Sequence, residues 1–264
     1  MKYVLENHVA SMTIDSFACQ VTSFVRKDTG IEYMWQADEK YWSGRNPTLF
    51  PHVSASKNKV LIFKNKEYKV GNHGFARRSE FSLVEQNTDS ITFKLSDNVN
   101  TYQEYPYHFD LFMKYRLVDD VVTINYAIIN KDEEIMPFGF GLHPAFNCPL
   151  TSDKVFEDYW VEFDNGDKYP LNYQDLKQVE TKIYRNIDFS KAVLTDGKHG
   201  VEMNFKGFRH FALWSAMGPF ICLEPWMNQI DNKKDWPMPF EEIEGIDKLE
   251  PNQKFEIGYS YRIF

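Results

Sequence analysis

The stretch LFMKYRLVDDVVTINYAI, residues 111–128, decides the fold class. Its first half alternates an apolar face with a face that carries Lys114 and Arg116, and a second alternating run follows the acidic pair Asp119-Asp120. An alternation of period two places every second side chain on the same face of a β-strand. Two such runs joined by a short turn predict an antiparallel hairpin of long strands.

The same alternation recurs along much of the chain, at residues 60–70, 91–96, 201–205, 211–223 and 255–263. Helical periodicity is scarce, and we expect only short helical turns, at residues 151–158 and 173–179. Strands without intervening helices favour packed antiparallel sheets over a parallel βαβ fold. We find no linker or internal repeat, and the irregular, Pro-rich stretch 232–239 is typical of a surface loop. The sequence therefore predicts one all-β domain spanning residues 1–264.

Composition excludes several classes of protein. The 264 residues include 43% hydrophobic side chains, enough for a substantial core. The formal net charge of −8 argues against nucleic-acid binding, which needs a basic surface, and gives no reason to expect binding to an anionic membrane. The three cysteines, Cys19, Cys148 and Cys222, are far apart, so neither a disulfide framework nor a thiolate metal site is expected. The N-terminus lacks the apolar run of a signal peptide, and we expect a cytoplasmic protein.

Two glycine-containing segments break the alternating pattern, as sequences often do where function demands it. Residues 44–51 place Arg45 in a Pro-bounded loop, where its guanidinium could donate hydrogen bonds to hydroxyl or carboxylate oxygens. An exposed turn is the simpler interpretation of Arg45 when this segment is taken alone. Residues 71–77 bracket His73 between two glycines, which suggests an unusual backbone path or close approach to a ligand. A hairpin turn with a structural histidine is the alternative there.

Two apolar segments each isolate one titratable group. His143 lies within residues 137–147, and Pro144 restricts it to extended geometry. Such surroundings can tune an imidazole for acid–base catalysis, although a lone core histidine is the simpler interpretation. Glu224 ends the apolar run 220–226, where partial desolvation would raise its pKa and make it a usable base. A glutamate satisfied by a backbone amide is the alternative.

Taken together, three of these motifs resemble the aldose 1-epimerase (galactose mutarotase-like) superfamily, and most closely its LacX-like branch. They are His-Gly-Phe-Ala-Arg at 73–77, His-Pro-Ala-Phe at 143–146 and Leu-Glu-Pro-Trp at 223–226. The resemblance covers most of the chain. It implies a large antiparallel β-supersandwich with a sugar site in the cleft of one curved sheet, requiring neither a cofactor nor a metal.

The resemblance also implies roles for individual residues in interconverting the α and β anomers of an aldose such as galactose or glucose. His143 matches the general acid and Glu224 the general base that open and close the sugar ring. The expected substrate-binding residues are His73 near the ring oxygen, Arg45 and less directly Arg77 as orienting cations, Trp226 as a stacking platform, and Asp231 as a contact to the hydroxyls. The implied partner is a small-molecule sugar, bound by a monomer or homodimer.

The loop after Pro51 departs from the family pattern, which continues toward a Gly-Arg pair. Here the chain reads His52-Val53-Ser54 instead. This departure leaves open whether the substrate is a free aldose or a sugar phosphate. It also leaves open a carbohydrate-binding or sensing protein that kept the cleft without useful turnover. A third hypothesis is a metal-dependent enzyme with the ligands His73, His108, His143 and Glu224, a chemically reasonable donor set that shows no recognisable ligand spacing.

Overall fold

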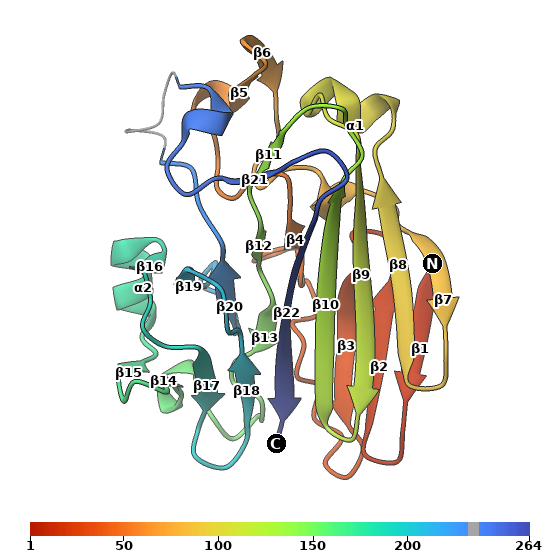
Figure 1. Cartoon of the computed structure of the whole chain (residues 1–264). Coiled ribbons are helices and arrows are strands. Elements are labelled where there is room, and N and C mark those ends of the chain that lie inside the picture. The colour runs from red at the N-terminus through yellow and green to blue at the C-terminus, as the bar shows by residue number, and fades with distance from the viewer. Residues whose placement is uncertain (232–237) are drawn as a thin grey trace.

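A nine-stranded antiparallel sheet is the framework of the computed structural model, which describes residues 1–231 and 238–264 (Figure 1). The hairpin predicted from residues 111–128 lies within this sheet, and Val118 pairs with Val121 across the turn Asp119-Asp120. The strands, in spatial order, are β15 (Lys168–Pro170), β14 (Trp160–Phe163), β17 (Lys191–Thr195), β18 (Gly200–Asn204), β22 (Lys254–Ile263), β10 (Val121–Asn130), β9 (Phe109–Val118), β8 (Ser90–Ser96) and β7 (Ser82–Gln86).

A three-stranded sheet covers part of this framework. It consists of β1 (Lys2–Glu6), β2 (Ala10–Asp15) and β3 (Gln20–Arg26). Edge-to-face aromatic contacts join the two sheets: Phe24 meets Tyr261 with a centroid separation of 5.7 Å, and Tyr3 meets Phe93 at 5.1 Å. These contacts show that the alternating apolar faces of the strands form a shared core.

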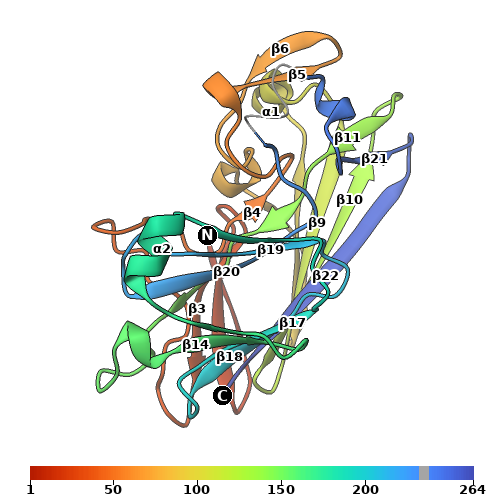
Figure 2. The same cartoon turned by 90° about the vertical axis from the view of Figure 1, so that its left-hand side faces the viewer.

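A six-stranded sheet carries the candidate site and runs across the direction of β10 and β22 (Figure 2). All seven residues of its strand β20 are buried. Its members are β16 (Lys182–Arg185), β19 (His210–Trp214), β20 (Phe220–Trp226), β12 (Gly141–Leu142) and β4 (Thr48–Leu49), with β13 (Ala145–Asn147) also pairing with β20. Two small sheets are also present among the described residues: β5 (Val60–Phe63) with β6 (Lys66–Lys69), and β11 (Met136–Phe138) with β21 (Asp247–Leu249).

The two α-helices in the described part of the chain are short: α1 (Val99–Glu104) and α2 (Tyr173–Val179). The helical turn predicted at 173–179 is confirmed, whereas the stretch 151–158 contains only the 3-10 turn Phe156–Asp158. Other 3-10 turns lie at Lys57–Lys59, Ala76–Arg78 and Phe240–Glu242. Of the surface loop predicted at 232–239, residues 232–237 lie outside the described residues.

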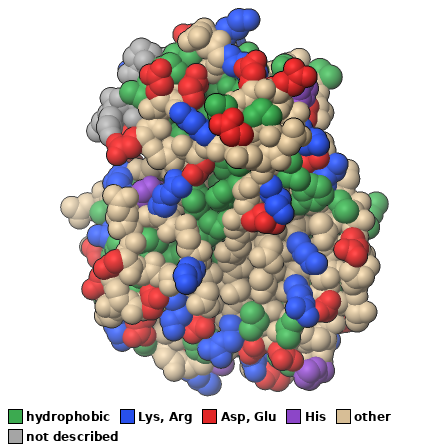
Figure 3. Space-filling model, viewed as in Figure 1, with side chains coloured by type: hydrophobic (Ala, Val, Ile, Leu, Met, Phe, Trp, Pro, Cys, Tyr) green, Lys and Arg blue, Asp and Glu red, His purple; other side chains and the backbone are tan. Residues whose placement is uncertain are grey.

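The structure also shows where the charged side chains and the three cysteines lie. Acidic and basic side chains are interspersed across the face seen in Figure 3. Cys19, Cys148 and Cys222 are all buried and free. Over residues 1–231 and 238–264, no helix is long and apolar enough to cross a lipid bilayer.

Candidate active site

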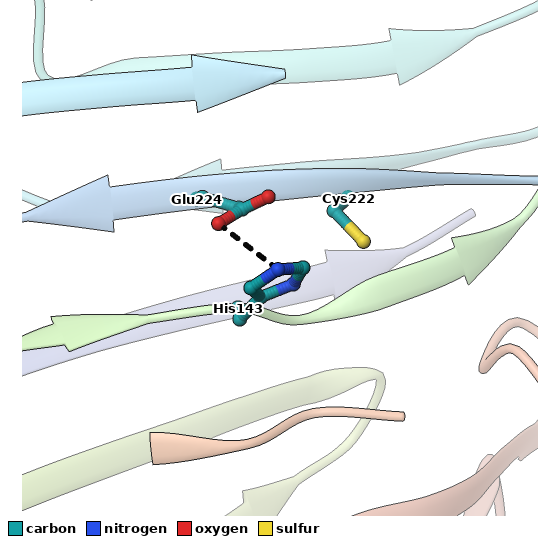
Figure 4. A group of neighbouring side chains, drawn as sticks. All are labelled: His143, Cys222 and Glu224. Atoms are coloured by element: carbon teal, nitrogen blue, oxygen red, sulfur yellow. Dashed lines mark ion pairs between the residues drawn. The ribbon is translucent and has the colours of Figure 1, made fainter. Parts of the chain in front are cut away.

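Strand pairing brings His143 and Glu224 face to face. Strands β12 and β13 pair with β20 on either side of the His143-Pro144 dipeptide, and this register continues to place His143 opposite Glu224. Pro144 has no N–H to donate, but its carbonyl accepts from the backbone N–H of Leu223 at 3.0 Å. Directly opposed residues of antiparallel strands project to the same face. The result is an imidazole Nε2 that lies 3.4 Å from Oε2 of Glu224 (Figure 4).

Both side chains keep a polar atom without a partner. His143 is 7% exposed and Glu224 is 1% exposed. Nδ1 of His143 and Oε1 of Glu224 make no hydrogen bond to any part of the chain that the structure describes. An unsatisfied buried polar atom costs roughly 1–3 kcal/mol, so native folds rarely leave two together without a reason. Their position on a cavity wall indicates that a polar ligand completes the site.

Burial controls the protonation of this pair. It lowers the pKa of His143 well below the ordinary value of 6.5, and the neighbouring His73 and Arg77 lower it further. Burial raises the pKa of Glu224 well above its ordinary value of 4.5, while Trp226 and Arg77 oppose that rise. Burial therefore favours a neutral imidazole beside a protonated carboxyl group. One transferable proton is shared by two groups that face the same space.

A left-handed backbone turn presents His73 to the same cavity. His73 has φ 60° and Gly74 has φ 69°, and a Cβ on Gly74 would collide with the carbonyl of Phe50. The backbone N–H of Ser54 donates to Nδ1 of His73 at 3.1 Å. A ring nitrogen that accepts cannot carry the proton, so neutral His73 carries it on Nε2. Burial lowers the pKa of His73 to about 3, and the ring acts as a fixed hydrogen-bond donor.

The buried side chain of His52 supports the turn at His73-Gly74. Its Nε2 accepts from the backbone N–H of Gly74 at 3.1 Å, and the backbone N–H of His73 donates to the carbonyl of Ser54 at 3.1 Å. His52 is fully buried, and burial lowers its pKa to about 4. The loop that departs from the family pattern at His52 thus supports the His73 turn through its backbone and one neutral imidazole.

The cavity in front of these groups has a volume of about 440 Å³. Arg77 is the one Lys or Arg side chain that lines it among the described residues. The walls are formed by Trp42, Ser54, Ala55, Asn72, His73, Arg77, His143, Thr181, Ile183, Trp214, Glu224 and Trp226. Small-molecule sites usually have a volume of about 300–1,000 Å³ and combine aromatic walls with a few polar groups, as this cavity does.

Trp42 is a site residue that the sequence reasoning missed. Its ring stacks on the imidazole of His143, with a centroid separation of 4.9 Å and an interplanar angle of 28°. A Cβ on Gly44 would collide with the Trp42 ring, so the glycine lets the loop fold back against its own tryptophan. Trp214 meets the same imidazole edge-on at 5.4 Å. The aromatic pair Tyr41-Trp42, two residues before Gly44, was the available signal.

Two of the residues predicted to contact substrate lie away from this cavity. Within the described residues, Arg45 does not line the cavity, because its guanidinium is turned toward the carbonyl of Thr22 at 3.1 Å and Oε1 of Gln36 at 3.4 Å. Arg77 lies on the cavity wall instead. Asp231 is exposed and lines a separate depression that also contains Arg185. The geometry therefore brings together His73, Arg77, His143, Glu224 and Trp226, and leaves Arg45 and Asp231 outside.

Trp226 lines the cavity in a different manner from the stacking platform that we expected. It is only 3% exposed and packs against Leu49, Val53 and Ala212. Its indole Nε1 is buried and completes no hydrogen bond within the described chain, although the side chain lies close enough to Glu224 to lower that pKa. Trp226 thus offers an N–H group, while Trp42 and Trp214 are half-buried and offer more of their ring surface.

The four-ligand metal hypothesis does not match the geometry. His108 is exposed and directly precedes β9, and its Nδ1 lies 2.7 Å from Oδ2 of Asp97. It is not among the described residues that line the cavity. It therefore cannot join His73, His143 and Glu224 in one coordination sphere.

Known proteins resemble this chain over most of its length. The family model described as aldose 1-epimerase matches residues 1–229. The plasmid-encoded protein LacX of Lactococcus lactis subsp. lactis is 33% identical over 263 residues, which cover 86% of this chain and 87% of LacX. The solved structure of a galactose mutarotase related enzyme from Lactobacillus acidophilus has a TM-score of 0.93 and 29% identity, covering 100% of this chain and 97% of that one. A galactose mutarotase-like protein from Lactobacillus casei also has a TM-score of 0.93, with 25% identity and full coverage of both chains.

Proposed function

Because the chain belongs to the aldose 1-epimerase family, with the galactose mutarotase-like fold predicted from its sequence, we propose that it interconverts the α and β anomers of an aldose. The single observation that carries this proposal is the His143–Glu224 pair. Two buried groups share one proton, each has an unpartnered atom, and both line a cavity of sugar-binding size. Galactose and glucose are the substrates we expect first.

The pair suits a proton exchange that opens the sugar ring. Glu224, as carboxylate, takes the proton of the C1 hydroxyl while the His143 imidazolium protonates the ring oxygen and the bond from C1 to that oxygen breaks. This step leaves neutral imidazole and protonated carboxyl, the state that burial favours at both groups. Rotation about the C1–C2 bond presents the other carbonyl face. Closure then returns both protons, so the pair ends as it began.

The remaining wall groups orient the sugar. His73 presents a donor at Nε2, since its Nδ1 is occupied by Ser54, and this donor suits a hydroxyl or ring oxygen. Arg77 supplies the cation, which also favours the carboxylate form of Glu224. Trp42 stacks on His143 and favours its cationic form through the ring quadrupole. Orientation of this kind accounts for a large share of catalysis in enzymes that use ordinary acid–base groups.

A carbohydrate-binding or sensing protein is the second candidate function. The loop at His52–Ser54, which departs from the family pattern, favours it. That loop supports the His73 turn directly, so its change affects the geometry of the site rather than a distant surface. This candidate keeps the same cavity and the same sugar contacts without rate enhancement.

Polarimetry distinguishes the two functions. Freshly dissolved α-glucose and α-galactose, followed by a panel of other aldoses and sugar phosphates, should mutarotate faster with the protein than without it. Glu224→Gln and His143→Asn should each lower the catalysed rate by about 10²–10⁴-fold. Saturable sugar binding without acceleration for any member of the panel would support the binding protein. Full activity in both variants of an active wild type would overturn the assigned roles.

A further inference from the structure

We propose that Cys222, with His143 and Glu224, forms a site for a thiophilic divalent cation such as Zn²⁺, and that the cation inhibits the protein by occupying the catalytic pair. The inhibitory consequence rests on the proposed epimerase function, whereas the binding itself does not. Figure 4 shows the three side chains converging on one space, with Cys222 and Glu224 two positions apart on the same face of β20 and His143 opposite them.

The separations match a tetrahedral ion. One possible ligand atom from each of the three residues lies within 4.8 Å of the other two. The observed 3.4 Å between Nε2 of His143 and Oε2 of Glu224 is close to the roughly 3.4 Å expected across a tetrahedral zinc with bonds of about 2.0–2.1 Å. A Zn–S bond of about 2.3 Å requires the sulfur to approach by up to roughly 1 Å, which rotation about its Cα–Cβ bond can supply.

An unpartnered carboxylate oxygen supports a ligand at this position. Glu224 is 1% exposed, and Oε1, the oxygen that faces away from His143 and toward Cys222, has no partner among the described residues. A bound cation would satisfy the carboxylate oxygen and fix the imidazole, leaving the cavity side of the ion open for water or a sugar hydroxyl.

The charge of the donor set selects the ion. Burial favours a protonated Glu224, so coordination releases two protons to solvent, one from the Cys222 thiol and one from the Glu224 carboxyl. The ligands then carry a thiolate, a carboxylate and a neutral imidazole. Their combined charge of about −2 neutralises a divalent cation, so the complex that is buried is close to neutral. A thiolate–imidazole–carboxylate set suits zinc, whereas magnesium and calcium prefer oxygen ligands throughout. Arg77 on the cavity wall opposes the ion and keeps its affinity below that of a dedicated structural site.

Inhibition follows directly from occupancy. The ion takes the imidazole lone pair and the carboxylate oxygens that would otherwise exchange protons with the sugar. A sugar in the cavity and a metal on its floor therefore compete for the same two side chains.

The experiment measures metal binding and activity separately on the full-length protein. Equilibrium dialysis with ZnCl₂ should show one bound zinc per chain in the wild type, and zinc should abolish the catalysed mutarotation. Cys222→Ala removes a ligand that takes no part in the proposed reaction, so it should keep activity. It should weaken zinc binding by at least roughly 100-fold, because even loss of a group that only supports a ligand costs about 10–100-fold. Cys148→Ala is the matched control, since Cys148 is equally buried and should leave zinc binding unchanged.

A measurement on the unaltered chain covers the case in which Cys222→Ala fails to fold. Cobalt(II) added to the wild type should produce an intense near-ultraviolet thiolate-to-cobalt charge-transfer band, which a site without sulfur cannot give. Absence of that band, or zinc binding by Cys222→Ala equal to that of the wild type, would overturn the proposal. If zinc binds through Cys222 but no aldose mutarotates, the metal site stands and the proposed epimerase function fails.

Discussion

His52 makes the stability of the molecule depend on pH in a way that can be calculated. Its imidazole is fully buried beneath the His73 turn, and burial lowers its pKa from 6.5 to about 4. Below pH 6.5 the unfolded chain binds a proton at this residue that the folded chain does not, so stability is lost as the pH falls from 6.5 through 4. The pKa difference, at about 1.36 kcal/mol for each pH unit, amounts to about 3 kcal/mol.

His52→Gln isolates this contribution. The glutamine amide reaches about as far as Nε2 and can accept from the backbone N–H of Gly74, but it does not titrate. Urea unfolding at pH 7 and pH 4 should show that the free energy of unfolding falls by about 3 kcal/mol less in the variant than in the wild type. His8→Gln is the control, because His8 is exposed and its removal should leave the wild-type difference unchanged. An equal loss in His52→Gln and wild type would refute the assignment of a buried, neutral His52.

Three further predictions concern the pocket. The pH profile of kcat/KM should show no fall in activity centred on 6.5, the ordinary pKa of histidine. Burial lowers the pKa of His143, so the His143–Glu224 pair keeps its single proton below pH 6.5. A fall in kcat/KM with its midpoint at pH 6.5 would contradict this. Trp42→Ala should reduce kcat/KM about tenfold through loss of the ring stacked on His143, with Trp42→Phe closer to wild type, and unchanged kinetics in Trp42→Ala would exclude that contact from function. Arg77→Met should reduce kcat/KM by about 10–100-fold, whereas Arg45→Met should change it by less than about threefold; the reverse order in steady-state assays would restore the role first expected for Arg45.

The sequence predicted those strand pairs that depend on local alternation of apolar and polar residues. The strand pairs β9–β10, β5–β6 and β19–β20 follow from period-two runs separated by short turns. Helix α1 escaped prediction because it has six residues and one buried side chain, Thr101, so it has no apolar stripe. Its start is fixed by a cap, in which the Asn98 side chain accepts from the N–H groups of Asn100 and Thr101.

The site was predictable where chemistry is concentrated in one motif. His143 and Glu224 were identified because each interrupts an apolar run, and the sheet then brings the two together. Contacts set by distant segments were not accessible from sequence. Trp42 reaches His143 from a distant loop and also stacks on Phe220 at the start of β20. The guanidinium of Arg45 is turned away by its hydrogen bond to a carbonyl on β3. Motifs reveal candidate groups, whereas the packing of loops decides which of them meet.

Exchange NMR at equilibrium tests the shared proton pair most directly. With glucose labelled with ¹³C at C1, the wild-type protein should produce exchange cross-peaks between the α and β anomeric carbons at short mixing times, and Glu224→Gln should return the exchange to the protein-free rate. Undiminished cross-peaks in Glu224→Gln would contradict the account, because the anomers would then interconvert without the carboxyl group that faces His143.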